Sequence, residues 1–364
     1  MLKNKSSKLK ALLIIVLFLS VAIMARPANA LVSQNSQNWF WNSDTNAASI
    51  AAGDVNGDGQ TEIATVGYWN DGLHWNSLLQ VWNATTLSVE NVVSWKWTND
   101  TNAVCVAVGD VNGDGQNEIV TGGTYFDGSR WIAQLQVWNG TTLVPENVIT
   151  WYWGSDTQIS SIAIGDVNGD SKNEIVTGGT YFDGTRYVAQ LHVWNGATLA
   201  VEKVQTWYWG GDTYVNSVVI SNITGGTSLS IITGGSFNDS IRTNAQLFVW
   251  STSTPSLTVQ NGVTWFTTSN TNIASIAVGN FTGGTSLDIA TGGSFNDGIR
   301  NNAQVVDFNG ANLAVKSSSS WFTTSNTEVN SVAIGPLSGA SNRIVASGEY
   351  FDGTRSEAQL TIWT

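Results

Sequence analysis

The sequence predicts an all-β protein, a six-bladed β-propeller built from four-stranded units. First, one segment recurs six times after Trp39, at a spacing of roughly 56 residues. Second, every unit contains four short runs that are rich in alternating or β-branched residues and bounded by Gly, Asn and Asp. Third, no segment shows a helical period. Tandem four-stranded units of this length are typical of propeller blades.

The third unit shows the expected strands of one blade. We expect strand A over residues 159–164, strand B over 174–177, strand C over 189–194 and strand D over 201–209. Strand A is rich in Ala, Ser and Ile, which suits the crowded innermost position next to the axis. The other units are expected to repeat this order.

The order of these strands along the chain predicts how the ring closes. A Trp-x-Trp pattern marks strand D, and its first copy, Trp39 and Trp41, precedes any strand A. The last unit reaches only strand C, which ends at Trp363. We therefore expect the N-terminal strand to complete the sixth blade and close the ring, because closure removes exposed strand edges.

The first 30 residues are expected to be a secretory signal peptide. Lysines come first, an apolar run follows over residues 11–24, and Ala28-Asn29-Ala30 forms a cleavage signal. The expected organisation is a signal peptide over 1–30, a short N-terminal segment over 31–38 and the propeller over 39–364. Secretion or display at the cell surface follows, with an uncleaved N-terminal anchor as the alternative.

Charge and cysteine usage limit the classes of partner. The formal net charge is −12, and much of the positive charge lies in the signal peptide. Such a surface repels nucleic acid and anionic lipid, so we expect neither nucleic-acid binding nor membrane insertion after cleavage. Cys105 is the only cysteine and excludes an intrachain disulfide. Ser occupies its position in the other units, so Cys105 is interpreted as a small packing residue.

Three loops between strands A and B predict metal sites. The pattern Asp-x-Asn-x-Asp, followed by a Glu, places oxygen ligands at alternate positions of a tight loop, which suits calcium. A backbone carbonyl supplies one further ligand, and up to three structural calcium ions are expected. A metal-free Asx-turn hairpin is the alternative. The candidate ligands are Asp54, Asn56, Asp58, Gln60 and Glu62; Asp110, Asn112, Asp114, Gln116 and Glu118; and Asp166, Asn168, Asp170, Lys172 and Glu174.

The third metal loop and the strand after it, from Ile162 through Asp166 and Glu174 to Gly179, resemble the FG-GAP/VCBS repeat. This repeat occurs in integrin alpha-subunit propellers and in many microbial surface proteins. The resemblance extends over residues 39–364 and is most specific in the first three units. It implies a calcium-stabilised propeller that acts in adhesion or recognition.

The loops between strands B and C form a second recurring pattern, of an aromatic residue, Asp and Arg. Asp occurs in every unit, and Arg in all but the first, which has His74. These side chains either brace a turn through an Asp–Arg pair or bind sugars or polar peptide groups on one face. The candidates are Trp69, Asp71 and His74; Tyr125, Asp127 and Arg130; Tyr181, Asp183 and Arg186; Asp239 and Arg242; Asp297 and Arg300; and Tyr350, Asp352 and Arg355.

No motif predicts catalysis. The sequence lacks a nucleophile elbow, a His-rich metal cluster and a phosphate loop. We therefore expect a monomeric recognition or adhesion module for an extracellular glycan or protein. The alternatives are a structural cell-surface protein without a small ligand and a polysaccharide-active enzyme, whose carboxylates would converge from different blades.

Overall fold

The computed structural model describes residues 36–41, 43–223, 228–253, 255–283, 286–336 and 342–363. Two compact units result, Met1–Asn38 and Trp39–Thr364. The expected signal peptide and its cleavage site lie outside the described residues. Within the described ranges, no helix is long and apolar enough to cross a membrane.

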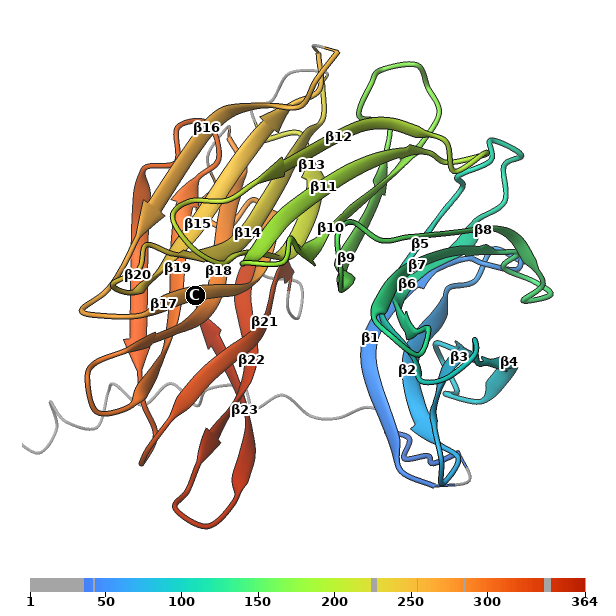
Figure 1. The fold of residues 1–364 in the computed structure, drawn as a ribbon, viewed down its shortest axis with the longest axis horizontal. Helices are drawn as coiled ribbons and strands as arrows, with labels where there is room; N and C mark the ends of the chain where they lie inside the picture. The colour runs from blue at the N-terminus through green and yellow to red at the C-terminus, as the bar shows by residue number, and fades with distance from the viewer. Residues whose placement is uncertain are drawn as a thin grey trace, which may run out of the picture. The chain divides into compact units, whose positions relative to one another are not determined.

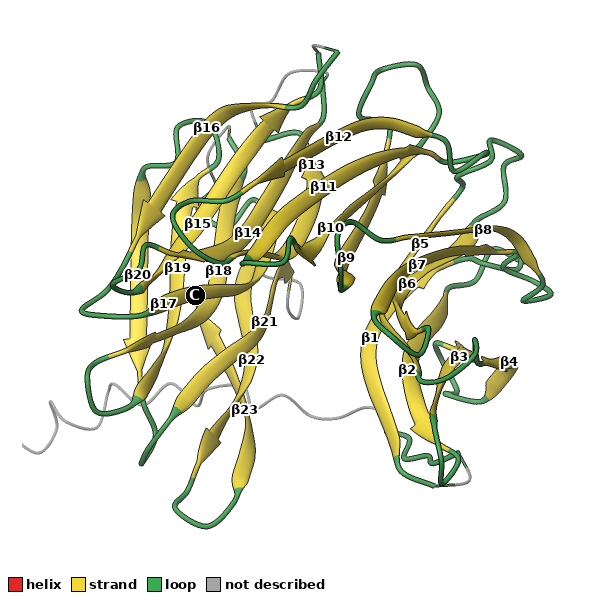
Figure 2. Ribbon diagram, in the orientation of Figure 1, coloured by secondary structure: helices red, strands yellow, loops and turns green. Residues whose placement is uncertain are grey.

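All regular secondary structure in these ranges is β, and the strands form six antiparallel sheets (Figures 1 and 2), which confirms the six-bladed propeller. The sheets are β1 (Thr45–Gly53), β2 (Glu62–Asn70), β3 (Trp75–Asn83) and β4 (Val89–Trp95); β5 (Thr101–Gly109), β6 (Glu118–Phe126), β7 (Trp131–Trp138) and β8 (Pro145–Trp151); β9 (Thr157–Gly165), β10 (Glu174–Phe182), β11 (Tyr187–Asn195) and β12 (Val201–Trp207); β13 (Thr213–Ser221), β14 (Ser230–Asn238), β15 (Thr243–Ser251) and β16 (Thr258–Trp265); β17 (Thr271–Gly279), β18 (Asp288–Asn296), β19 (Asn301–Asn309) and β20 (Val315–Trp321); and β21 (Thr327–Pro336), β22 (Asn342–Phe351) and β23 (Ser356–Trp363).

Paired tryptophans join successive blades. Trp95, at the end of β4, packs at 4.8 Å between ring centroids on Trp138 of the next blade. Its indole Nε1 donates to Gln134 Oε1 at 3.1 Å, and Trp138 Nε1 donates to Thr121 Oγ1 at 2.9 Å. The same pairing recurs between later blades, so these tryptophans belong to the core rather than to a binding face.

A bulge in the first strand of each blade explains a recurring glycine. In the second blade the register shifts between Ala103 and Cys105. A Cβ atom on Gly123 would lie 2.0 Å from the carbonyl oxygen of Asn102, so only glycine fits opposite the bulge. Cys105 is buried, and burial raises the pKa of its thiol to about 12, which is consistent with a packing role.

Two strand limits differ from the expectation. Strand B extends to Phe126 and Phe182, so the aromatic residues assigned to the B–C loops, such as Tyr125 and Tyr181, lie inside strands. Strand D ends at the first Trp of each Trp-x-Trp pattern, as at Trp207. The cross-strand hydrogen bonds continue through these aromatic residues. The alternation of apolar and polar residues in the sequence did not show this, so the aromatic residues were assigned to the loop.

The closing strand lies only partly within the described residues. Among the described residues, the sixth sheet has three strands, and Trp41 forms a bridge only with Ser43. Trp39 does occupy the strand D position against the first blade, because its ring lies 4.8 Å from that of Trp82. The faces that a closed ring would bury are open: Leu360 is 55% exposed, whereas Leu79 at the same position of the first blade is 0% exposed.

Candidate functional site

The three predicted metal loops connect the first and second strands of blades one to three. In the first loop, the carboxylate of Asp54 accepts the backbone N–H groups of Gly57 and Gly59 at 2.7 and 2.9 Å. Glu62 Oε2 accepts the N–H of Val55 at 2.9 Å. The other two loops repeat this arrangement. Each loop therefore gathers its oxygen atoms around one tight turn.

The glutamate that follows each loop is buried without a balancing charge. Glu62 is 0% exposed, and its Oε1 atom accepts no hydrogen bond from any described residue. In the next two blades the corresponding oxygens accept only the side-chain amides of Asn112 and Asn168. Burial raises the pKa of all three carboxyl groups, that of Glu174 to about 7. Desolvation by burial disfavours the charged form of each carboxyl group.

The fourth strand adds a second carboxylate beside each of these glutamates. Glu90, Glu146 and Glu202 repel Glu62, Glu118 and Glu174, respectively. The two carboxylates come from the second and fourth strands of the same blade, which both pair with the third strand. Like charges on these two strands disfavour the ionised form of the buried glutamates and add to the rise in their pKa values.

The fifth blade shows how the same position is satisfied without a metal. Asp288 occupies the position of Glu62, and Lys316 occupies that of Glu90. The ammonium group of Lys316 bonds to Asp288, and also donates to Thr282 Oγ1 at 2.8 Å. Burial would raise the pKa of Asp288, but Lys316 and Thr282 outweigh it, and the pKa is lowered.

The donor set of the first three loops fits a hard divalent cation: carboxylate and amide oxygens, one of them buried and unpartnered. No group of three or more His, Cys, Asp or Glu side chains lies in a ligating arrangement within the described ranges. The carboxylates instead accept hydrogen bonds from their own loop. The calcium assignment is therefore taken up below as a proposal.

The second and third strands of each blade are joined by turns that Asp stabilises. Asp127 Oδ1 accepts the N–H groups of Ser129 and Arg130 at 2.7 and 2.9 Å. These hydrogen bonds lower the pKa of Asp127, that of Arg130 contributing most. The same pair of bonds forms at the other candidate aspartates, Asp71, Asp183, Asp239, Asp297 and Asp352.

The arginines of these turns stack on aromatic rings. The guanidinium carbon of Arg130 lies 4.6 Å from the ring centroid of Tyr152, and Arg130 Nε lies 3.9 Å from Asp127 Oδ2. Such stacking is favourable and orders the side chain. Arg186, Arg242 and Arg300 stack in the same way on Tyr208, Phe266 and Phe322. This geometry supports the bracing interpretation of these arginines.

The first and last blades depart from this pattern. In the first, Lys96 replaces the aromatic residue and lies 3.4 Å from Asp71, while His74 Nδ1 lies 3.3 Å from Asp100 Oδ1. In the sixth, Arg355 pairs with Glu357 at 3.1 Å and its side chain is 74% exposed. Phe40, at the corresponding aromatic position, is also exposed.

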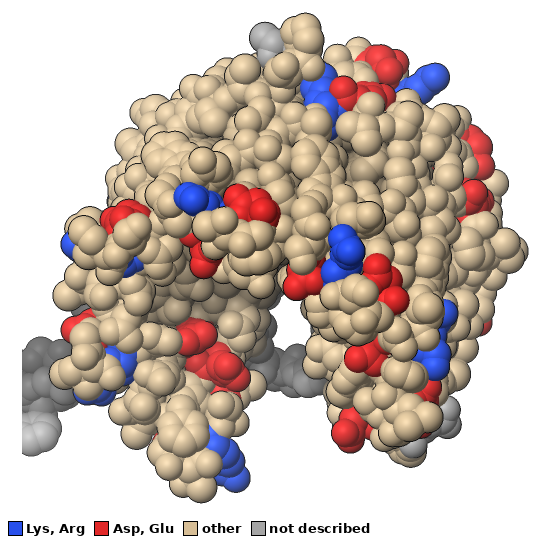
Figure 3. Space-filling view, viewed as in Figure 1, with Lys and Arg blue, Asp and Glu red and all other residues tan. Residues whose placement is uncertain are grey.

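The aromatic candidates contact protein side chains. Trp69 Nε1 donates to Ser94 Oγ at 2.7 Å. Tyr125 packs 5.3 Å from Trp97, and Tyr350 donates to Glu357. Tyr181 lies 5.7 Å from Trp153. On the side seen in Figure 3, acidic and basic groups are interspersed among a mostly uncharged surface.

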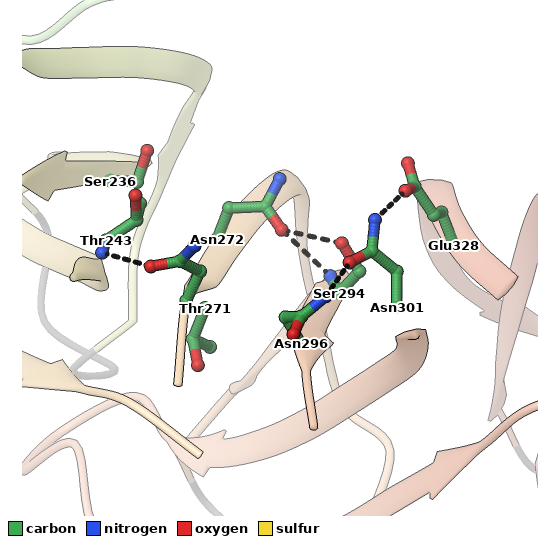
Figure 4. Close-up of a pocket in the computed structure, with 9 residues that line it drawn as sticks. Ser236, Thr243, Thr271, Asn272, Ser294, Asn296, Asn301 and Glu328 are labelled. Atoms are coloured by element: carbon green, nitrogen blue, oxygen red, sulfur yellow. Dashed lines mark hydrogen bonds between the residues drawn. The ribbon is translucent and has the colours of Figure 1, made fainter. Parts of the chain in front are cut away.

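A polar cavity of about 350 Å³ lies at the end of the blades that carries these turns, between the fourth, fifth and sixth blades. Figure 4 shows the side chains that line it. Asn272 Oδ1 accepts hydrogen bonds from Ser294 N and Oγ at 3.1 and 2.9 Å. Asn296 Nδ2 donates to Asn301 Oδ1 at 2.9 Å, and Asn301 Nδ2 donates to Glu328 Oε1 at 2.6 Å.

Sequence reasoning missed this cavity because it concentrated on residues that recur. In the third blade the corresponding positions carry an aromatic pair, Phe182 and Tyr187, at 5.3 Å. In the fifth blade they carry Asn296 and Asn301. The signal was therefore a departure from the repeat, in which amides replace rings and leave a polar hollow.

Comparisons with known proteins agree with the repeat. The sequence profile of the FG-GAP-like repeat matches residues 54–121, which contain the first two metal loops. The first two units of this propeller therefore contain an FG-GAP-like repeat.

Solved structures also match this propeller. Sqt1 from Chaetomium thermophilum is 14% identical over 84% of this chain and 80% of that one, with a TM-score of 0.46. The Dos1 propeller is 14% identical over 85% of this chain and 68% of that one, with a TM-score of 0.49. No curated protein matches.

Proposed function

We propose that this FG-GAP repeat propeller is an exported, non-catalytic recognition module whose polar cavity binds an extracellular glycan. The single observation that carries this proposal is the network of Asn272, Ser294, Asn296, Asn301 and Glu328 around the cavity. Amide and carboxylate groups match the hydroxyl groups of a sugar, which donate and accept hydrogen bonds.

The network is also held in place before a ligand arrives. Asn272 and Asn301 are each fixed by a hydrogen bond to a neighbouring strand, so little side-chain freedom remains to be lost on binding. In Figure 4 the amide nitrogen of Asn272 and the second carboxylate oxygen of Glu328 point away from these bonds, where a ligand can reach them.

Calcium is proposed to stabilise the first three blades of this module. The paired carboxylates at Glu62 and Glu90 require a positive charge, and Lys316 supplies one at the corresponding place in the fifth blade. Asp54, Asn56, Asp58 and the backbone carbonyl of Gln60 would complete the first site. Bound calcium would neutralise these oxygens and fix the hairpin.

The proposed binding is tested with a glycan and polysaccharide array, using the exported protein with calcium and again with a chelator. Specific binding identifies the ligand, and Glu328→Gln is then expected to weaken it by about tenfold or more, because a hydrogen bond to a charged group is lost. Asp183→Asn, in a turn of the third blade, is the control and should retain affinity. Equal losses in both variants would contradict the assignment of the cavity.

A protein partner is the second candidate, and one observation favours it. The turns beside the cavity present Ile241 and Ile299, which are 80% and 82% exposed. Exposed aliphatic side chains beside a polar site suit the rim of a protein interface. A silent array, together with loss of partner capture in the double variant Ile241→Ser and Ile299→Ser, would support this candidate over a glycan.

A further inference from the structure

The predicted calcium loops of the first three blades are linked in series by asparagine side chains. Asn117 lies between Gln116 and Glu118, two candidate ligands of the second loop. Its Nδ2 atom donates to the backbone carbonyl oxygen of Asp54, the first candidate ligand of the first loop, at 2.8 Å. A residue of one loop therefore holds a ligand of the loop before it.

This bond fixes a peptide group that also contacts the buried glutamate of the first loop. The carbonyl of Asp54 and the N–H of Val55 belong to the same planar peptide group. That N–H donates to Glu62 Oε2 at 2.9 Å, while Glu62 Oε1 accepts no hydrogen bond from any described residue. Hydrogen bonds in such a chain polarise and strengthen one another. Asn117 therefore acts through one peptide group on Glu62, and the chain leaves the second carboxylate oxygen to a ligand.

The second and third loops repeat this chain of hydrogen bonds. Asn173 Nδ2 donates to the carbonyl oxygen of Asp110 at 2.8 Å, and the N–H of Val111 donates to Glu118 Oε2 at 2.9 Å. The fourth blade gives the third loop no such amide, because Leu229 occupies the equivalent position. The series therefore joins three successive loops and ends at the third.

Close backbone packing leaves these contacts little room to shift. The hairpin between the third and fourth strands of the second blade places Gly140 against both loops. A Cβ atom on Gly140 would lie 2.3 Å from the carbonyl oxygen of Val55 and 2.4 Å from that of Asn117. Close-packed interiors transmit a displacement, so a change in the order of one loop reaches the other.

The fifth and sixth blades contain the same bond without the calcium pattern. Asn342 Nδ2 donates to the carbonyl oxygen of Asn280 at 2.7 Å, and the N–H of Phe281 donates to Asp288 Oδ2 at 2.9 Å. Lys316 supplies the positive charge there. This copy of the bond braces two blades without a candidate calcium ligand, so it provides a matched control for the first three loops.

We propose that Asn117 and Asn173 are positioning residues that couple neighbouring calcium sites, so that calcium in the second site strengthens binding at the first, and calcium in the third strengthens binding at the second. The inference rests on the calcium sites proposed above. An occupied loop is ordered, so its asparagine holds the ligands of the preceding loop before calcium arrives there, and less order remains to be imposed. Linkage makes the coupling reciprocal.

The first test measures calcium binding by calorimetric titration of the exported protein. Asn117→Leu introduces the residue of the fourth blade, and it is expected to weaken the binding of one ion by about tenfold without changing the number of ions bound. Asn117→Thr introduces the residue of the first blade and should have the same effect. Asn342→Leu, the matched control, should lower the melting temperature equally in calcium and in chelator and leave the titration unchanged.

A titration of both Asn117 variants that equals the native one would leave this asparagine only a bracing role and overturn the proposal. So would a loss of melting temperature that is the same in calcium and in chelator.

A second test measures the coupling itself. Asp166→Asn impairs the third site, and it is expected to weaken binding at the second by about fivefold or more. In the Asn173→Leu background this additional weakening should be absent. Weakening of equal size in both backgrounds, or in neither, would overturn the coupling. A native protein that binds no calcium would overturn the calcium sites and the coupling together, whereas binding to the glycan array would still support the cavity.

Discussion

At the scale of single residues, the aspartates of the turns combine a structural role with a defined pH response. Asp127 accepts two backbone N–H groups, and the resulting pKa lies below the ordinary value of 3.8. A lowered folded-state pKa means that the stabilisation is complete above the unfolded pKa and is lost as the pH falls through the folded pKa. These turns should therefore weaken only in acid.

The corresponding prediction compares Asp127→Ala with the native protein across pH. The variant is expected to melt at a lower temperature at pH 5 and above. This difference should shrink below about pH 3.8, because Asp127 of the unfolded chain then binds a proton that the native carboxylate, with its lowered pKa, binds only at lower pH. Asn139→Ala is a matched control, since Asn139 Oδ1 accepts the N–H of Thr142 at 3.0 Å without a charge. Its effect should not depend on pH in this range. A constant difference for Asp127→Ala would contradict the assignment.

The role of the arginines in the turns could not be predicted from the sequence of one unit. The recurring Asp and Arg indicated either a braced turn or a binding surface, and nothing in one unit could separate the two. The structure adds Tyr152, which comes from a strand outside the Asp-Gly-x-Arg pattern and stacks on Arg130. Cation–π contacts between separate segments leave no local pattern, so this part of the site required coordinates.

At the scale of elements, the hairpin between the first and second strands of a blade carries one of two charge arrangements. One places a buried glutamate beside a second glutamate, and the other places Asp288 beside Lys316. The fourth blade has Ser230 and Gln260 at these positions and so carries no charge there. Charge at the two positions therefore changes together in the first five blades.

This contrast predicts opposite calcium responses of two variants. Lys316→Met should destabilise the protein by about 3 kcal/mol with or without calcium, because it leaves the buried Asp288 unpaired. Asp166→Asn should lower the melting temperature by more in calcium than in chelator, because saturation of a site at 100 times its Kd contributes about 2.7 kcal/mol beyond the backbone hydrogen bonds that Asp166 accepts. Thermal melts with calcium and with a chelator measure both. An effect of equal size in the two conditions would contradict the metal assignment.

The presence of the strands and hairpins was easier to predict from the sequence than the residues at which they begin and end. The recurring Asp-x-Asn-x-Asp pattern located the hairpins of the first three blades, and alternation located the strands. Sequence did not indicate that Asn296 and Asn301 open a cavity, because the filling of that space depends on rings from adjoining strands. Departures from a repeat become meaningful only when the packing of the intact units is known.

At the scale of the whole molecule, the seam between the last and first blades controls stability. Leu360 and Ile50 lie on faces that intermediate blades bury against the next blade, and they are 55% and 66% exposed. Burying two such side chains contributes about 3 kcal/mol or more. The sequence predicted which segment closes the ring, and the packing of Trp39 on Trp82 is the part of that prediction seen in the described residues.

Removal of residues 31–42 is therefore expected to unfold or oligomerise the protein, because β23 keeps an exposed edge that can pair with another chain. Size-exclusion chromatography and thermal melting of the truncated protein measure this. A double substitution that leaves the backbone intact, Ser36→Ala and Gln37→Ala, is the control and should remain monomeric. A fully folded monomeric truncation would contradict closure by the N-terminal strand.

The position of Trp39 near the start of the chain affects the order in which the blades assemble during folding. Contacts between successive blades join nearby parts of the chain, so blades can assemble in the order in which they are synthesised. The seam joins segments at opposite ends, and contacts of such separation form slowly. The strand that leaves the ribosome first would then be the last to find its place. Until β23 has been translated, that strand has only half of its binding surface, so the last step of folding depends on the residues that are synthesised first.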